Sequence, residues 1–198
     1  MRADLNQIRD WIKPNTRVLD LGCGDGTLMQ HLQENYNIVG YGLEIDHKKI
    51  VQCIEKKVNV IQADLNKGLG QYFADNSFDY VIMSQTLQAT ERPDQLLLEM
   101  LRVGKEAIVT FPNHGHWKNR ISLALSGKMP VTRTLPYQWY DTPNTHLCTL
   151  RDFEILCKNK DIQIIKRTVV DHSHEQGLLM SYFPNLFGEI AMYHLRKL

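Results

Sequence analysis

The positions of apolar residues along the 198-residue chain predict strands that alternate with helices. Short apolar runs, typical of buried strands, occupy residues 17–21, 38–43, 58–62, 78–83 and 107–111. Between them, helical spacing of apolar residues predicts helices at 3–12, 27–35, about 46–56 and 94–102. Pro14 closes the first helix, Asp46 is placed to cap the third, and Pro93 opens the fourth. Strands and helices at this spacing predict a doubly wound α/β fold, with a mainly parallel sheet covered by helices on both faces.

The alternation stops after Pro112. Residues 113–149 are rich in Pro, Trp, Tyr and His, and their pattern predicts only one helix, at 117–125. After this segment the pattern of apolar residues again predicts regular elements: a helix at 150–159 and two strands, at 162–170 and 189–196, joined by a long loop. The length suits one domain, residues 1–198, in which 113–149 is an insertion after the fifth strand.

Charge and composition narrow the classes of function. Lys and Arg number 23 against 22 Asp and Glu, and no long basic stripe occurs, so nucleic acid is not an expected partner. Lys48-Lys49 and Lys56-Lys57 are expected to form the solvated side of one helix. No apolar run approaches the roughly 18 residues needed to cross a membrane, and the first residues hold no apolar signal core. With four cysteines and no C-x-x-C pair, we expect a cytoplasmic protein with reduced thiols.

The stretch VLDLGCGDGTL, residues 18–28, places three glycines on alternate positions directly after the first strand. In a doubly wound sheet this first strand-to-helix turn is the expected ligand-binding turn. The dinucleotide pattern needs a small third residue at position 27, where the chain has Thr27, and Asp20 would repel a pyrophosphate. A ligand with an ammonium and a sulfonium group suits that carboxylate, so the turn favours S-adenosylmethionine or S-adenosylhomocysteine over NAD. Its candidate cofactor residues are Asp20, Gly22, Cys23, Gly24 and Gly26, with Cys23 present for packing rather than reactivity.

Acidic residues also follow the next two strands. Glu44, beside Ile45, can accept hydrogen bonds from ribose hydroxyls, while Asp64 and the N–H of Leu65 can bind adenine. Each acid taken alone could equally be a helix cap or a loop residue. Three acids at three successive strand ends favour an adenosyl site. Ser84 and Gln85 end the fourth strand, where Gln85 contacts the ligand or is an ordinary loop residue.

Histidines lie beyond the fifth strand, where an acceptor would enter. His114 and His116 are candidate general bases or ordinary hydrogen-bonding loop residues. Together with His146 and Cys148 they do not have the paired spacing of a zinc site, so no metal is expected. His172 and His174 are expected in a polar loop.

These residues resemble the class I S-adenosylmethionine-dependent methyltransferase superfamily. The resemblance covers D-x-G-x-G-x-G at 20–26, Glu44, Asp64 and FDYVIM at 78–83. It implies a Rossmann-like fold with seven strands, the final pair antiparallel, and S-adenosylmethionine or S-adenosylhomocysteine as cofactor. Members that methylate bases end the fourth strand in an Asp/Asn-Pro-Pro-aromatic tetrad, which Ser84-Gln85-Thr86-Leu87 does not match.

A narrower resemblance covers nearly the whole chain. SQTLQAT (84–90), LLEMLRVGKEAIVTFPNHGHWKNR (97–120), GKMPVT (127–132) and LPYQWYDTPNTHLCT (135–149) are similar to the MetW family of methionine biosynthesis proteins. The resemblance implies a partner that supports a homoserine O-acyltransferase, usually the acetyl-CoA-dependent type, and implies no methyl acceptor. The alternative is an active methyltransferase on a small molecule; an NAD-binding protein is a weaker third hypothesis.

Aromatic residues make 113–149 the most distinctive segment. It could be a partner surface, a lid over the substrate, or a loop packed on its own sheet. Trp, Tyr and Arg are enriched where proteins bind one another, and loops carry function on such scaffolds. The candidate partner or substrate residues are His114, His116, Trp117, Arg120, Tyr137, Trp139 and Tyr140.

Overall fold

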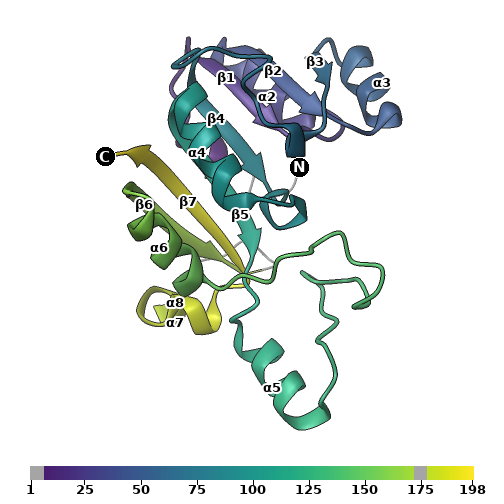
Figure 1. Ribbon diagram of the computed structural model, residues 1–198, viewed down its shortest axis with the longest axis vertical. Coiled ribbons are helices and arrows are strands. Elements are labelled where there is room, and N and C mark those ends of the chain that lie inside the picture. Colours follow the sequence, from purple (N-terminus) through teal and green to yellow (C-terminus); the bar gives the residue numbers. More distant parts are fainter. Residues whose placement is uncertain (1–6, 172–177) are drawn as a thin grey trace.

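The computed structural model describes residues 7–171 and 178–198, and its strands form one seven-stranded sheet in the order β3-β2-β1-β4-β5-β7-β6 (Figure 1). The strands are β1 (Arg17–Leu21), β2 (Val39–Glu44), β3 (Asn59–Gln62), β4 (Phe78–Ser84), β5 (Gly104–Pro112), β6 (Ile162–Val170) and β7 (Ile190–Lys197). The first five strands pair in parallel, while β7 is antiparallel to both β5 and β6. The strand order reverses beside β1, which places the expected ligand turn at the switch point of the sheet.

Helices cover both faces of the sheet, as the alternating pattern predicted. From residue 17 on, the described helices are α2 (Thr27–Tyr36), α3 (His47–Glu55), α4 (Pro93–Val103), α5 (Trp117–Ser126), α6 (Leu150–Asn159), α7 (Leu178–Tyr182) and α8 (Pro184–Phe187), with 3-10 turns η1 (Leu65–Lys67) and η2 (Leu87–Ala89). Of these, α5 belongs to the insertion and does not cover the sheet. One apolar core joins the sheet to α4 and α6 through Leu97, Met100 and Phe153. A second joins its other face to α2 and α3 through Met29 and Cys53. The Rossmann-like fold is therefore confirmed.

Two local predictions were wrong. Within the described residues the first helix covers only 7–9, and the chain turns at 10–12 before reaching Pro14. The joint between β6 and β7 holds α7 and α8, where the pattern predicted a loop. Helices of four and five residues are too short to show an apolar period, so the pattern could not reveal them. His172 and His174 lie outside the described residues.

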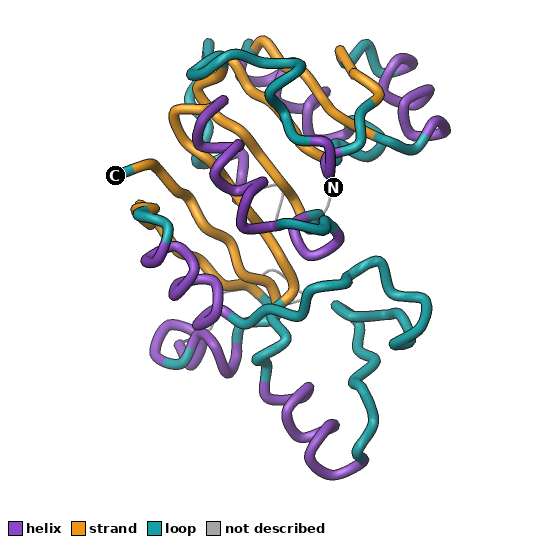
Figure 2. The backbone as a smooth tube through the Cα atoms, in the orientation of Figure 1, coloured by secondary structure: helices purple, strands orange, loops and turns teal. Residues whose placement is uncertain are grey.

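The insertion leaves the sheet after β5 and projects away from it (Figure 2). Its predicted helix is present as α5, and residues 127–149 contain no helix or strand. The first end is anchored by the Asn113 side chain, which donates to the carbonyls of Asn185 (3.1 Å) and Gly188 (2.8 Å). The other end is anchored at Gln88: the His146 backbone donates to its carbonyl at 3.0 Å. The two ends are therefore tied to η2, which follows β4, and to the segment of α8 that precedes β7.

Candidate functional site

The glycine turn needs glycine because its backbone is left-handed at each of the three alternate positions. The φ angles of Gly22, Gly24 and Gly26 are 74°, 59° and 76°, a conformation that costs other residues about 1–2 kcal/mol. The N–H groups of Gly22 and Cys23 donate to the Leu43 carbonyl at 2.8 and 3.1 Å, which ties the turn to the end of β2. The alternating glycines thus follow directly from the shape of the turn.

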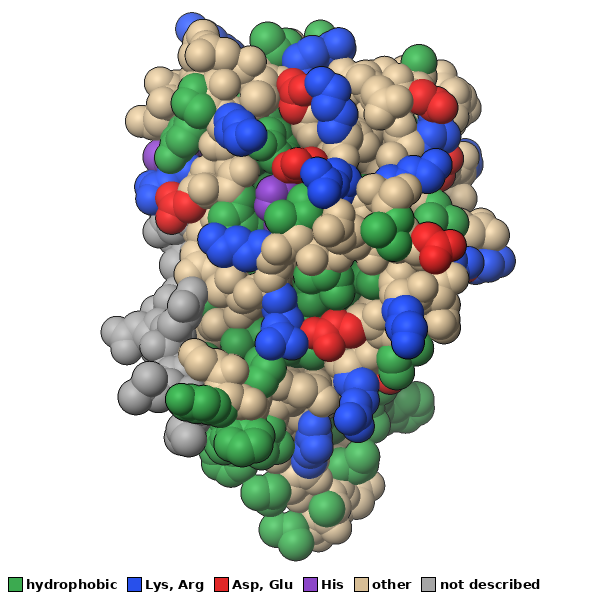
Figure 3. Space-filling model, turned by 90° about the vertical axis from the view of Figure 1, so that its left-hand side faces the viewer, with side chains coloured by type: hydrophobic (Ala, Val, Ile, Leu, Met, Phe, Trp, Pro, Cys, Tyr) green, Lys and Arg blue, Asp and Glu red, His purple; other side chains and the backbone are tan. Residues whose placement is uncertain are grey.

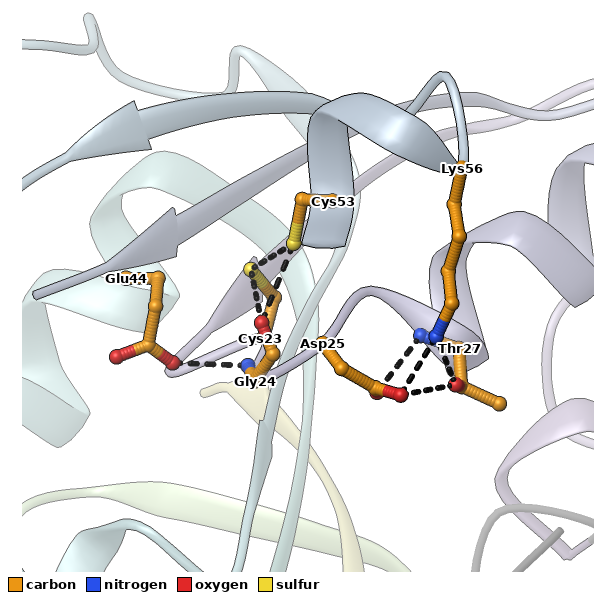
Figure 4. Close-up of polar contacts among 7 residues, drawn as sticks. All are labelled: Cys23, Gly24, Asp25, Thr27, Glu44, Cys53 and Lys56. Carbon is orange, nitrogen blue, oxygen red and sulfur yellow. Dashed lines mark hydrogen bonds and ion pairs between the residues drawn. The ribbon is translucent and has the colours of Figure 1, made fainter. Parts of the chain in front are cut away.

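Cys23 packs beneath the turn, as predicted. Its sulfur lies over Gly42, where an added Cβ would come within 2.4 Å of it. The Cys53 sulfur lies 3.8 Å from it and 3.2 Å from the Gly24 carbonyl oxygen (Figure 4). Burial raises the pKa of both thiols, so neither forms a thiolate nucleophile near neutral pH.

An ion pair closes the outer side of the turn. The Lys56 ammonium group donates to Asp25 and, at 2.6 Å, to the Thr27 hydroxyl (Figure 4). Burial opposes ionisation of Asp25, but the hydrogen bonds from Lys56 and Thr27 outweigh it and lower its pKa to about 2. Lys56 therefore binds the turn instead of lying free on a solvated helix face, and Lys49, also expected on that face, lines the cavity described below.

Glu44 is buried and holds the turn from the end of β2. Its carboxylate accepts from the N–H groups of Gly24 (2.9 Å), Ile45 (2.9 Å) and Asp46 (3.0 Å). One oxygen, Oε2, takes a single one of these bonds, and since a carboxylate oxygen has two lone pairs it retains room for a ligand hydroxyl. Glu44 therefore has a structural role that the sequence pattern did not reveal.

Asp64 stands at the end of β3 and caps η1, because its carboxylate accepts from the Asn66 N–H at 3.0 Å. Asp46 caps α3 in the same way, accepting from the Lys48 N–H at 2.8 Å. Leu65 follows Asp64 and is half-buried, while the Ile45 side chain is 61% exposed. The two strand ends thus present their predicted residues at the same edge of the sheet.

A cavity of about 850 Å³ opens above the turn. Among the predicted residues it brings together Asp20, Gly22, Cys23, Gly24, Ser84, Gln85 and Tyr137. The predicted residues outside its lining are Gly26, Glu44, Ile45, Asp64, Leu65, His114, His116, Trp117, Arg120, Trp139 and Tyr140. Two carboxylates (Asp20 and Asp25) and two cations (Lys49 and Arg133) line it, so the cavity can neutralise both ends of a zwitterion.

The end of β4 forms one wall of this cavity. The Gln85 backbone is left-handed, with φ 54°, and its N–H donates to the Thr110 carbonyl at 2.9 Å. A left-handed residue other than glycine is a strained conformation of the kind that concentrates at binding sites. Thr86 lies against the turn: a Cβ added to Gly22 would meet its Oγ1 at 2.7 Å.

The two candidate bases lie outside the cavity lining, at the start of the insertion. His116 is 5% exposed, and its Nε2 lies 3.9 Å from a Glu189 carboxylate oxygen. His114 is half-buried, with Nδ1 3.5 Å from the Gln88 side-chain nitrogen. Burial lowers the pKa of both imidazoles. In the described part of the chain no group of three His, Cys, Asp or Glu side chains is placed to hold a metal ion.

Sequence reasoning missed several lining residues. They are Asp25, Thr27, Leu28, Lys49, Thr86, Pro112, Arg133, Thr134, Pro136, Pro143, Asn144 and Ile190. Thr86 follows directly after a strand end and could have been found from that position. The residues of the insertion reach the cavity only because its two ends are anchored beside it, which no local pattern shows.

One family model matches the chain over nearly its whole length. The family model for methionine biosynthesis protein MetW matches residues 2–195. A bifunctional methionine biosynthesis protein MetXA/MetW from Rhodopirellula baltica is 32% identical over 201 residues. That alignment covers 97% of this chain but 32% of the relative, so the chain spans about a third of that protein's length.

Solved structures share the fold at low sequence identity. An S-adenosylmethionine-dependent methyltransferase from Mesorhizobium loti superposes with a TM-score of 0.71 at 16% identity, covering 98% of each chain. The cyclase SpnF superposes with a TM-score of 0.66 at 18% identity, covering 98% of this chain and 80% of its own. Proteins named for different reactions thus share this architecture, so the fold by itself does not fix the reaction.

Among the described helices, none combines the length and the apolar character that a transmembrane helix needs.

The expected fold and the expected family agree with the comparisons. Because the family model covers residues 2–195, the chain belongs to the MetW family of methionine biosynthesis proteins.

Proposed function

We propose that this chain supports a homoserine O-acyltransferase of methionine synthesis, of the acetyl-CoA-dependent type, as a bound partner. The observation that carries the proposal is the Rhodopirellula baltica relative, in which a MetW portion similar to this chain shares one polypeptide with MetXA. Fusion keeps two proteins together at high effective concentration, which is useful when they act as a complex. We assign the pair to the cytoplasm, a reducing compartment that suits the two neighbouring thiols of Cys23 and Cys53.

The experiment uses the purified chain and the purified acyltransferase of the same organism. The proposal predicts that the two co-elute as one species in size-exclusion chromatography and bind with a measurable Kd in calorimetry. Separate elution at micromolar concentrations, with no heat of binding, would contradict it.

We also propose that the cavity over the glycine turn holds S-adenosylmethionine or S-adenosylhomocysteine. The cavity volume lies within the range of small-molecule sites, about 300–1,000 Å³. Asp20 suits the ligand's ammonium group, and Lys49 and Arg133 suit its carboxylate. Oε2 of Glu44 accepts a hydrogen bond from a ribose hydroxyl, and Asp64 and the Leu65 N–H bind adenine at the adjoining edge of the sheet. Ile45, Ser84 and Gln85 complete the contacts, and Gly26 shapes the turn without lining the cavity.

Calorimetric titration tests this ligand. Binding of S-adenosylhomocysteine at micromolar concentration is expected, with no binding of NAD at millimolar concentration. Asp20→Asn should weaken binding at least tenfold, whereas Asp10→Asn, at an exposed carboxylate outside the cavity lining, should leave it unchanged. Equal affinity in both variants would remove Asp20 from the site.

A second candidate function is methyl transfer to a small molecule. The cavity favours it because the lining continues past the turn to Pro112 and Ile190, where an acceptor has room beside the cofactor. Incubation with methyl-labelled S-adenosylmethionine and a metabolite extract tests it. Transfer of label by the wild-type chain but not by Asp20→Asn would establish the activity. Absence of transfer would contradict it, and the partner role would then be the one remaining proposal.

A further inference from the structure

The segment 117–140, here called the arm, exposes an unusual amount of apolar surface. It holds nine of the twenty exposed large hydrophobic residues in the described part of the chain: Trp117, Ile121, Leu123, Leu125, Met129, Val131, Tyr137, Trp139 and Tyr140. Helix α5 is part of the arm, and its only buried residue is Asn119. Exposed apolar side chains gathered on one segment in this way are typical of an interaction site.

The apolar residues are arranged as a stripe. Trp117, Ile121 and Leu125 recur at four-residue spacing, so they follow one side of α5. Their exposure rises along the helix, from 38% through 48% to 84%. Trp139 and Tyr140, 74% and 71% exposed, pack edge to face with ring centroids 5.7 Å apart. The most exposed apolar side chains therefore lie farthest along α5 and in the returning chain.

The arm is also positively charged. Between Ala107 and Tyr140 the sequence has no Asp or Glu, but it has Lys118, Arg120, Lys128 and Arg133. Lys118 pairs with Glu189 at 3.4 Å; no described carboxylate forms an ion pair with the other three. Figure 3 shows hydrophobic and basic side chains together at the lower end of the molecule, where Figure 1 places α5.

We propose that the arm is the docking element for the acyltransferase, and that it binds an apolar groove bordered by carboxylates on that enzyme. This inference rests on the proposed function. The apolar stripe supplies the buried centre of the contact, and Arg120 and Lys128 supply orientation and rate of encounter, while Arg133 lines the cavity. Arg120 is already positioned, because its Nε donates to the Gly115 carbonyl at 2.6 Å.

The charge and side-chain types of the arm favour the acyltransferase over two other partners, a second copy of the chain and single-stranded nucleic acid. A two-fold contact in which the arms of two copies face each other would bring like charges together, which disfavours it. Single-stranded nucleic acid is bound by aromatic stacking and basic grooves. The stripe on α5 is aliphatic beyond Trp117, with Ile121 and Leu125, and these two side chains cannot stack on bases.

The test measures the Kd of the full-length chain for the purified acyltransferase. The arm variants are Leu125→Ser, Trp139→Ala and Lys128→Glu. The matched controls are Ile54→Ser, 63% exposed on α3, and Lys158→Glu, exposed on α6. Each arm variant is expected to weaken binding at least tenfold, and each control less than twofold. Urea denaturation midpoints within experimental error of wild type verify that the variants are folded.

The possible outcomes separate this inference from the proposed function. If the wild-type chain binds the enzyme and the arm variants bind as tightly, the arm is not the docking element. If the wild-type chain does not bind, the partner role fails and the arm loses its occupant with it. The arm variants could instead abolish dimerisation of the chain, or its binding of poly(U), and leave enzyme binding intact. Either result would show that the arm binds a second copy or a nucleic acid, and would overturn the inference.

Discussion

Replacement of Gly22 by alanine tests the geometry of the ligand turn. The residue has φ 74°, and a Cβ there would lie 2.7 Å from Oγ1 and 2.9 Å from Cγ2 of Thr86. Gly24 offers a matched control, because its φ is 59° and an added Cβ would meet nothing within 4 Å. The control variant isolates the cost of the left-handed backbone from the cost of the clash.

The expected magnitudes follow from these contacts. The left-handed conformation should lower the free energy of unfolding by about 1–2 kcal/mol in Gly24→Ala. Gly22→Ala should lose the same amount plus about 1–3 kcal/mol for crowding against Thr86. Thr86→Ala alone should cost about 1 kcal/mol, because its hydroxyl donates to the Ser84 carbonyl at 3.1 Å.

Urea denaturation of the two single variants and the Gly22→Ala/Thr86→Ala double variant completes the cycle. Removal of Oγ1 and Cγ2 relieves most of the clash, so the double variant should be about 1–2 kcal/mol more stable than the sum of the single costs implies. Additive costs would refute the reasoning, as would a loss in Gly24→Ala equal to that in Gly22→Ala.

Three further predictions concern charge and coupling. The pKa of Asp25 in the folded chain is about 2, below its ordinary 3.8. Ionised Asp25 therefore adds to the free energy of unfolding above pH 3.8, and this contribution is lost as the pH falls through 2. Because the pair is partly exposed, Lys56→Met should cost only about 0.5 kcal/mol at pH 7 and flatten the acid end of the stability curve, as measured by urea denaturation at several pH values. Burial keeps His114 and His116 neutral at pH 7, so NMR titration should give midpoints below 6.5; a higher value for either would mean that a charged partner outweighs burial. Since Tyr137 of the arm also lines the cavity, S-adenosylhomocysteine should change the Kd for the acyltransferase severalfold, and an unchanged Kd would show that the two sites are independent.

The strands and main helices could be predicted because each carries a complete local pattern. Helix α4 shows this well: Pro93 begins it, and its buried Leu97 and Met100 repeat at helical spacing. The glycine turn was equally predictable, since three left-handed positions leave little choice but glycine. These features depend on neighbouring residues alone.

The remaining parts of the site depend on contacts between distant segments. Glu44 accepts from Gly24, twenty residues earlier, and Lys56 reaches Asp25 across thirty-one residues. The insertion could be recognised from its composition, but its path to the cavity is set by hydrogen bonds at Asn113 and Gln88. Such tertiary contacts have no periodic signal in the sequence.

The rate of the acyltransferase, measured with and without stoichiometric amounts of this chain and with no added cofactor, tests the central claim most directly. The proposed partnership predicts a rate increase of severalfold or more that saturates at the Kd of the complex. A rate that stays unchanged at saturating concentrations of the chain would contradict the partner role and leave methyl transfer as the function to pursue.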